Sequence, residues 1–182
     1  MLYKLAIHEF LENNFRACVI NCAAALERFY EFFLQVVFHH NGYSSETFYE
    51  EIWLPIKDRS KRQEDLFKDT FIELTSIEKP PVLKDTHRKF RNHIVHQGEF
   101  PKKEQTRDFA DTIFRIIGFG LYTLYKYCDS SLQGSTTSKD LREILVKMIM
   151  DVLDDNSINI LFPLVIQICD ELNSSQEVNH KK

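Results

Sequence analysis

Residues 14–39 limit the possible folds more than any other stretch, because they run without a glycine or a proline. The stretch is rich in alanine at its start and in aromatic residues further on, with apolar residues at helical spacing. This pattern predicts a long, largely buried helix. The whole chain of 182 residues has only five glycines and five prolines, which disfavours a turn-rich β-sandwich or barrel. The predicted fold class is therefore all-α.

Further helices are predicted on both sides of this one, and together they form a bundle of four to five helices over residues 1–128. No stretch predicts a convincing strand. The predicted segments are a short first helix with Leu2, Ala6 and Phe10 on one face, a piece at 45–53 capped by Ser45, a helix at 60–77 opened by a capping box of Ser60 and Gln63, a helix at 85–98 closed by Gly98, and a long helix with Pro101 in its first turn.

The C-terminal third of the chain is predicted to be a separate helical appendage. Residues 129–138 form a polar linker, and residues 139–173 hold two more helical patterns that pack on the bundle or on a partner. The polar tail at 174–182 is predicted to be disordered.

Composition argues against several classes of protein. The net charge of −4 does not indicate general nucleic-acid binding, so any such binding needs a local patch. No signal peptide or membrane-spanning segment is recognisable, and a cytoplasmic location with no membrane partner is expected. The cysteines form no CxxC pair and fit core positions in a reducing compartment. They are Cys18, Cys22, Cys128 and Cys169.

Arg91 occupies an apolar part of the predicted 85–98 helix. At about 100° per residue, it falls between Ile94 and Val95 around the helix axis. A buried guanidinium stays charged, and an unpaired buried charge costs on the order of 3–5 kcal/mol. Arg91 therefore requires an anion from a neighbouring helix.

Glu27 is the candidate for that anion, because it shares an apolar face of the 14–39 helix, where carboxylates are rare unless paired. One interpretation is an ion pair between Glu27 and Arg91 that joins two packed helices. The other is that Glu27 pairs with the adjacent Arg28 or caps a polar groove. The sequence leaves both open.

Asn92 and His96 form a polar stripe on the 85–98 helix, one turn apart. His96 follows Arg91 by five residues, so an ideal helix separates the two by about 140°. They can converge only near a helix end, at a kink, or across a two-fold axis with a second copy. Gly98, two residues later, favours the helix end.

The segment Arg91-Asn92-x-x-x-His96, followed by Gly98, resembles the RNxxxH form of the Rx4–6H motif of the HEPN superfamily. Val95 also stands where many members have valine. The upstream segment NNFRACVINCAAALERFYEFFL, in which small residues lead into Ala-Leu-Glu, is similar to a helix of the same superfamily. The resemblance covers the predicted bundle and does not extend to the C-terminal pair.

The resemblance implies a HEPN-like dimer in which two motifs share one cleft. Many members are metal-independent endoribonucleases of toxin or anti-phage defence systems, and others are non-catalytic modules. For this chain it implies RNA cleavage to a 2′,3′-cyclic phosphate and a 5′-hydroxyl, without cofactor or metal. His96 would transfer protons, Arg91 would stabilise the phosphate charge and Asn92 would assist. The expected partners are RNA, a second copy, and an antitoxin or another defence protein.

The chain departs from one branch of the superfamily. Gly98 stands two positions after His96, where toxins modified by a nucleotidyltransferase antitoxin carry a tyrosine. The resemblance therefore does not imply that partnership.

Basic residues near the motif are the predicted RNA contacts in an otherwise acidic chain. The same charges also suit an ordinary solvated helix. Glu27 is assigned a supporting role, holding Arg91, and His93 is assigned a surface or supporting role. The predicted RNA-binding residues are Arg88, Lys89, Lys102 and Lys103.

Other interpretations remain beside the ribonuclease. A metal site of His87, His93 and His96 is disfavoured, because no carboxylate or cysteine stands at suitable spacing. A non-catalytic HEPN-like module would use the motif for an interhelical ion network while binding nucleotide, RNA or protein. A helical antitoxin or assembly subunit would dock a partner through the 139–173 pair.

Overall fold

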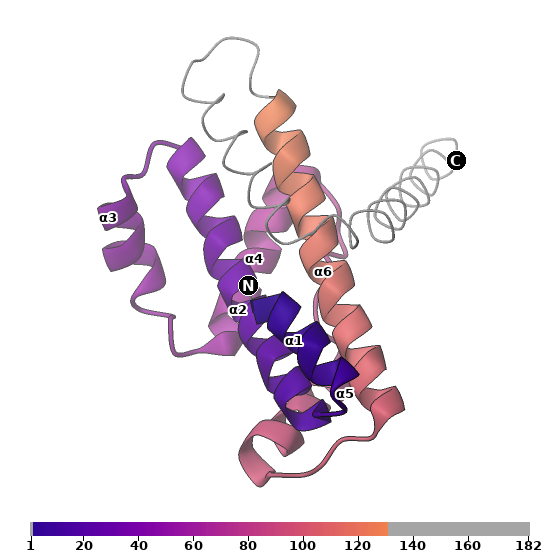
Figure 1. Ribbon diagram of the computed structural model, residues 1–182. Helices are drawn as coiled ribbons and strands as arrows, with labels where there is room; N and C mark the ends of the chain where they lie inside the picture. Colours follow the sequence, from indigo (N-terminus) through magenta and orange to yellow (C-terminus); the bar gives the residue numbers. More distant parts are fainter. Residues whose placement is uncertain (1, 131–182) are drawn as a thin grey trace. The chain divides into compact units, whose positions relative to one another are not determined.

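The computed structural model describes residues 2–130, and the elements in this range are helices with no strand among them (Figure 1). The predicted all-α class is therefore confirmed for this part of the chain. In chain order the elements are α1 (Leu2–Leu11), α2 (Phe15–His40), α3 (Ser45–Thr47), the π-helix η1 (Phe48–Trp53), α4 (Ser60–Thr75), α5 (Asp85–Asn92), the π-helix η2 (His93–Gln97) and α6 (Lys103–Ser130).

The chain divides into two compact units, residues 1–124 and 125–182, and the first contains the motif. The predicted linker at 129–138 overlaps α6 at its first two residues, and its remainder lies outside the described part. The predicted 139–173 helical pair and the 174–182 tail also lie outside it. Over residues 2–130, no helix is long and apolar enough to cross a bilayer.

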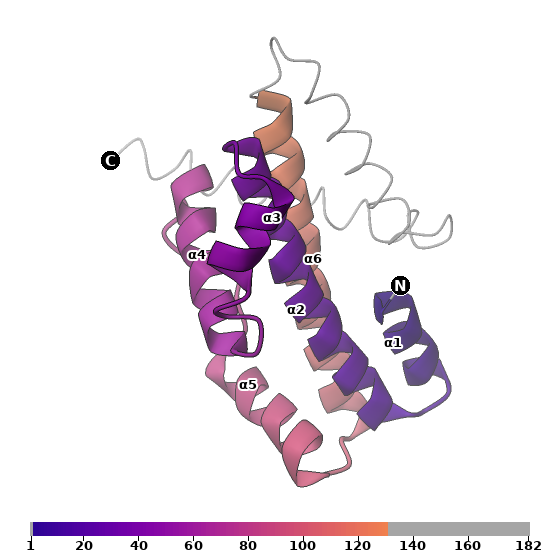
Figure 2. The same ribbon diagram turned by 90° about the vertical axis from the view of Figure 1, so that its left-hand side faces the viewer.

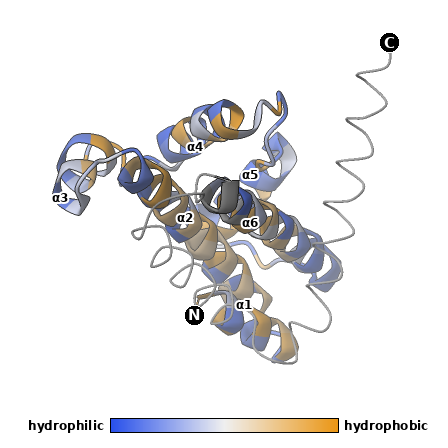
Figure 3. Ribbon diagram, turned by 90° about the horizontal axis from the view of Figure 1, so that it is seen from above, coloured by the Kyte–Doolittle hydropathy of each residue, from blue (hydrophilic) through white to orange (hydrophobic). Residues whose placement is uncertain are grey.

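Helix α2 is the central element of the first unit. It runs between α1 and α4, with α6 alongside (Figure 2). Hydrophobic residues extend along α2, whereas α5 is mostly hydrophilic (Figure 3). The first half of α2 carries small buried residues, including Cys18 and Cys22, which are free thiols in the core as predicted. The small side chains allow α1 to lie close, and the larger aromatic residues of the second half fill the wider space toward α4.

Aromatic rings form the core between α2 and α4. Phe33 and Phe67 are fully buried and pack edge to face, with ring centroids 4.8 Å apart. Phe67 also contacts Phe29 at 5.8 Å and Phe71 at 5.7 Å. Edge-to-face and offset pairs of this kind add stability beyond the apolar area they bury. These contacts bury one face of α2 and one face of α4, in line with the largely buried helix predicted at 14–39.

Helix α6 approaches α2 closely at Gly120. A β-carbon placed on Gly120 would lie 2.2 Å from Cζ of Phe29, which is well inside van der Waals contact. The missing side chain therefore makes room for the Phe29 ring. Before Gly120 on the same helix, Phe119 packs on Phe71 and Phe109 packs on Phe90.

A Gly120→Ala substitution is expected to lower the free energy of unfolding by about 1–3 kcal/mol, because the added methyl group overpacks a dense core. Urea denaturation followed by circular dichroism measures this. Adding Phe29→Leu should recover part of the loss, since the smaller side chain vacates the space. If Gly120→Ala is instead stabilising by about 1 kcal/mol, as at an open helical position, the close approach is wrong.

The starts of three helices differ from the prediction. Ser44, not Ser45, caps α3, with its Oγ accepting a hydrogen bond from the Thr47 amide at 3.0 Å. Helix α6 begins at Lys103, so Pro101 precedes the first turn. The predicted capping box of α4 is wrong, because its two side chains have other partners: Ser60 donates to Glu27, and Gln63 donates to backbone carbonyls of the preceding turn.

The predicted 85–98 helix is present but changes its winding. It is α-helical through Asn92 and π-helical from His93 to Gln97, with hydrogen bonds reaching one residue further back. Gly98 ends it with φ +75°, in the left-handed region that favours glycine, and its amide donates to the His93 carbonyl. The predicted end at Gly98 is confirmed, and the π-turn was not predicted.

Candidate functional site

An ion pair joins the motif to the central helix. Arg91 Nη2 on α5 donates to Glu27 Oε1 on α2 at 2.5 Å. The alternative partner, Arg28, points elsewhere and pairs with Glu31 at 2.5 Å. The sequence-based inference of a Glu27–Arg91 pair is therefore confirmed. Glu27 is more open than its apolar stripe suggested, with 38% of its side chain exposed.

Ser60 completes this contact from the first turn of α4. Its hydroxyl donates to Glu27 Oε1 at 2.6 Å, and it also lies 3.1 Å from Arg91 Nη2 as an acceptor. Arg91 Nη1 donates to Asn92 Oδ1 at 3.2 Å. Three helices thus hold one guanidinium in a defined orientation, because Nη2 is bonded to Glu27 and Ser60 and Nη1 is bonded to Asn92.

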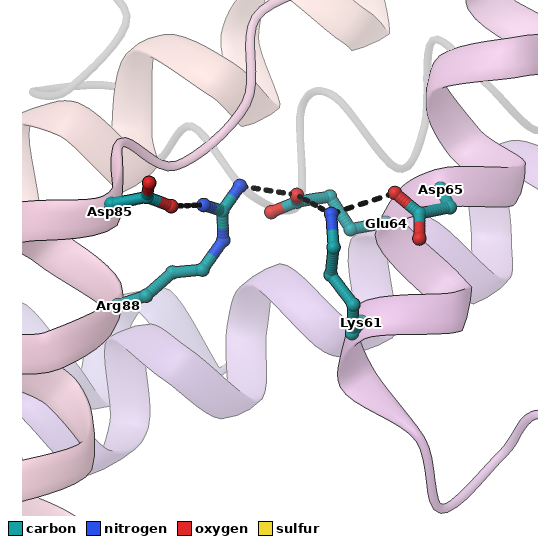
Figure 4. A network of polar contacts seen from close by, with 5 residues as sticks. All are labelled: Lys61, Glu64, Asp65, Asp85 and Arg88. Atoms are coloured by element: carbon teal, nitrogen blue, oxygen red, sulfur yellow. Dashed lines mark hydrogen bonds and ion pairs between the residues drawn. The ribbon is translucent and has the colours of Figure 1, made fainter.

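A second ion pair lies one helical turn away, in the same seam, which is the polar contact of α5 with α2 and α4. Arg88 on α5 donates to Glu64 Oε1 on α4 at 2.5 Å and also pairs with Asp85 on its own helix (Figure 4). Lys61 reaches the same Glu64 oxygen at 3.5 Å and Asp65 at 2.7 Å (Figure 4). Glu64 is the buried member of the network, with only 5% of its side chain exposed.

Electrostatics in this seam follow from burial and from pairing. Burial opposes the charge of Arg88, but the bonds to Glu64 and the charge of Asp85 outweigh it, so the pKa of Arg88 is raised. Burial, together with the neighbouring Glu64 carboxylate, raises the pKa of Tyr30 well above its usual range. The seam between α2, α4 and α5 is therefore polar, and the Tyr30 hydroxyl is buried in it without a hydrogen-bond partner among the described residues.

The π-turn changes the relation between Arg91 and His96. Each residue of a π-turn rotates the chain by less than the ~100° of an α-helix. The five residues from Arg91 to His96 therefore sweep less than an α-helix would, which narrows the 140° gap expected from the sequence. Such turns are frequent at functional sites. His96 is exposed within this turn.

The remaining residues of the motif face solvent. Asn92 is exposed apart from its bond to Arg91, and His93 is exposed with its Nδ1 3.7 Å from Glu99 Oε1. The His93 side chain has a partner on its own segment and makes no hydrogen bond or ion pair with Arg91 or His96 within residues 2–130. Its supporting role stays a prediction.

The four predicted RNA-binding residues do not form one uniform patch. Lys89, Lys102 and Lys103 are exposed, and Lys103 Nζ lies 6.0 Å from the Phe10 ring centroid. Arg88 is bound to two carboxylates, so its charge is largely neutralised. The lysines are therefore better placed than Arg88 to meet a phosphate backbone.

Three residues of the site were missed by sequence reasoning. Ser60 was assigned to a cap, although its spacing of four from Glu64 places both on one face of α4. Glu64 itself carried a signal, since Phe67 and Phe71 lie on a neighbouring stripe and a carboxylate there needs a cation. Arg16 carried none: its guanidinium lies near Gly98, with Nη2 3.9 Å from the position of an added β-carbon.

Residues 2–130 contain no cluster of three or more His, Cys, Asp or Glu side chains arranged to hold a metal ion. Comparisons of the chain with protein-family models, with curated proteins and with solved structures found no match.

Proposed function

We propose that the protein is a metal-independent endoribonuclease of the HEPN type that acts as a homodimer. One observation carries the proposal: Arg91 is held by Glu27 and Ser60 at the start of a π-turn that presents an exposed His96. The proposed site is Arg91, Asn92 and His96. The proposed setting is toxin or anti-phage defence, with an antitoxin or another defence protein as partner.

The chemistry of RNA cleavage matches these side chains. A base must take the proton of the 2′-hydroxyl, an acid must protonate the 5′-oxygen, and a cation must stabilise the extra charge on phosphorus. An unperturbed histidine titrates near pH ~6.5 and can do either proton transfer. One His96 from each protomer would supply both. The products would be a 2′,3′-cyclic phosphate and a 5′-hydroxyl.

Arg91 keeps hydrogen-bonding capacity for a phosphate. A guanidinium has five N–H donors. Glu27, Ser60 and Asn92 accept from at most three of them, which leaves at least two for phosphate oxygens. Because Glu27 orients the group before substrate arrives, little further ordering is needed when the phosphate binds. The exposed lysines Lys89 and Lys103 would contact neighbouring phosphates.

Purified protein is expected to cleave single-stranded RNA in the presence of EDTA, and His96→Ala should lower the rate at least about 100-fold through loss of acid–base catalysis. Cleavage of a 5′-labelled oligonucleotide measures the rate. Direct labelling of the downstream product by polynucleotide kinase reports its 5′-hydroxyl. Light scattering on the same sample should give twice the chain mass.

His8→Ala is the matched control, since it removes an exposed histidine from α1 that is not part of the proposed site. Circular dichroism establishes equal folding of each variant. Cleavage that disappears with EDTA, or that His96→Ala and Arg91→Ala retain at the wild-type rate, would overturn the proposal.

A second candidate function is a non-catalytic HEPN-like module. The observation that favours it is the engagement of Arg91 by three groups within the chain, together with the parallel Arg88–Glu64 pair. In this case the motif serves to join three helices, and the exposed surface binds nucleotide, RNA or protein. Absence of cleavage, combined with a marked loss of stability in Glu27→Ala, would favour the module.

A further inference from the structure

A cavity of about 400 Å³ is lined by Glu27 and by residues outside the motif helix. It is formed where the second half of α2 faces η1 and the turn that leads into α4. Glu27 lines it and at the same time accepts the hydrogen bond from Arg91. A ligand in the cavity would therefore be separated from the phosphate-binding guanidinium by one side chain. The lining of the cavity includes Glu27, Glu31, Tyr49, Trp53, Asp58 and Gln63.

Gln63 supplies a buried acceptor without a partner. The side chain is 2% exposed, and its Nε2 donates to the carbonyl oxygens of Ile56 at 3.3 Å and Lys57 at 2.6 Å. Because only the amide nitrogen can donate to two carbonyls, the orientation of the group is determined. Its Oε1 is buried and has no hydrogen-bond partner among the described residues. Such an acceptor costs about 1–3 kcal/mol unless a donor reaches it.

The charged groups of the cavity add further acceptors. Glu27, Glu31 and Asp58 are carboxylates, Glu31 is paired with Arg28, and the exposed Lys57 adds an ammonium donor to the lining. Ionised carboxylates only accept hydrogen bonds. The cavity therefore suits a ligand whose edge combines N–H donors for the carboxylates with an acceptor for the Lys57 ammonium.

Two aromatic residues, Tyr49 and Trp53, line the cavity. Tyr49 is 47% exposed, and Trp53 is buried with its ring stacked on Phe48. Stacking of a base on an aromatic ring contributes about 1–3 kcal/mol and is tolerant of sequence. The aromatic residues and the hydrogen-bond acceptors of the lining together suit a planar ligand with amino and imino groups.

We propose that this cavity binds an amino-bearing nucleobase, with guanine as the best fit, next to the phosphate held by Arg91. Guanine carries two adjacent donors, N1–H and the N2 amino group, that match a carboxylate and the Gln63 oxygen, and one carbonyl, O6, that matches the Lys57 ammonium. Uracil offers two carbonyl oxygens and a single N–H on the corresponding edge. This inference rests on the proposed function, since it gives the ribonuclease a preference for the base beside the cleaved phosphate.

Trp53 makes the inference directly measurable, because it is the single tryptophan of the chain and lines the cavity. Titration of the full chain with guanosine monophosphate is expected to quench its fluorescence, with a Kd about tenfold or more below that for uridine monophosphate. The measurement needs no cleavage. Equal affinity for both nucleotides, or no saturable quenching, would overturn the inference even if the protein cleaves RNA.

Tyr49→Ala and Asp58→Asn should each weaken binding of guanosine monophosphate while leaving the fold intact, since both residues are exposed. Tyr43→Ala is the matched control: it removes another exposed tyrosine that precedes α3 and does not line the cavity. If Tyr49→Ala and Asp58→Asn both bind as tightly as wild type, guanine lies elsewhere and the inference is wrong.

A second titration distinguishes RNA from a free nucleotide as the source of the base. The probe is a 2′-O-methyl trinucleotide with a central guanine, which cannot undergo transesterification. Tighter binding than the mononucleotide, lost in Arg91→Ala, supports a base read beside the motif. Equal binding of both probes would show a nucleotide site independent of RNA and would overturn the link to the ribonuclease.

Discussion

Phe67→Ala is expected to lower the free energy of unfolding by about 3–5 kcal/mol, because it removes a fully buried ring and leaves a cavity. Phe67 stands where α4 meets α2, and its ring contacts Phe29, Phe33 and Phe71. A loss of this size is a large fraction of the 5–15 kcal/mol that typically stabilises a domain. The first unit should therefore be partly unfolded at 37 °C.

Urea denaturation followed by far-ultraviolet circular dichroism measures the effect of Phe67→Ala. Phe67→Leu should fall between the variant and wild type, because it retains part of the apolar volume. Phe100→Ala is the control, since Phe100 is 86% exposed and should change stability by less than about 0.5 kcal/mol. Similar losses for Phe67→Ala and Phe100→Ala would contradict the described core.

Glu64→Ala is expected to lower the free energy of unfolding by about 3 kcal/mol, toward the lower end for breaking a buried pair because Arg88 is partly exposed and keeps Asp85. The loss arises from leaving the Arg88 charge without its buried partner. Thermal and urea denaturation both report it. The double variant Glu64→Leu with Arg88→Met should recover most of the stability, because it removes both charges and keeps apolar volume.

The same network contains its own control. Lys61 and Asp65 form an exposed pair at 2.7 Å, one turn apart on α4 (Figure 4). Exposed pairs contribute about 0–1 kcal/mol and are screened by salt. Asp65→Asn should therefore have little effect. If Asp65→Asn costs as much as Glu64→Ala, burial does not determine the strength of this network.

Apolar periodicity predicted which helices form and which faces they bury. The faces of α2 and α4 that carry Phe33 and Phe67 follow directly from spacing. The caps at helix ends were harder to predict from the sequence, because capping depends on which partner a side chain meets in the folded protein. Ser60 has the right residue type for a cap, but the carboxylate of Glu27 comes from a helix 33 positions earlier and takes its hydroxyl.

The Glu27–Arg91 pair could be predicted because two charged residues on apolar faces each require the other. The neighbouring Arg88–Glu64 pair follows the same logic but was hidden by the many other charges of these helices. Gly120 gave no signal, since the reason for a glycine there is the position of the Phe29 ring on another helix. The π-turn could not be predicted either, because the sequence-based geometry assumed a constant rotation of about 100° per residue.

The π-turn at His93–Gln97 has a consequence for how the motif tolerates insertion and deletion. A π-turn is in effect an α-helix that has accommodated one extra residue without ending. The number of residues between Arg91 and His96 can therefore vary while both side chains stay at the same end of the helix. Sequences that form such a helix are expected to show a range of spacings in this motif rather than a single spacing.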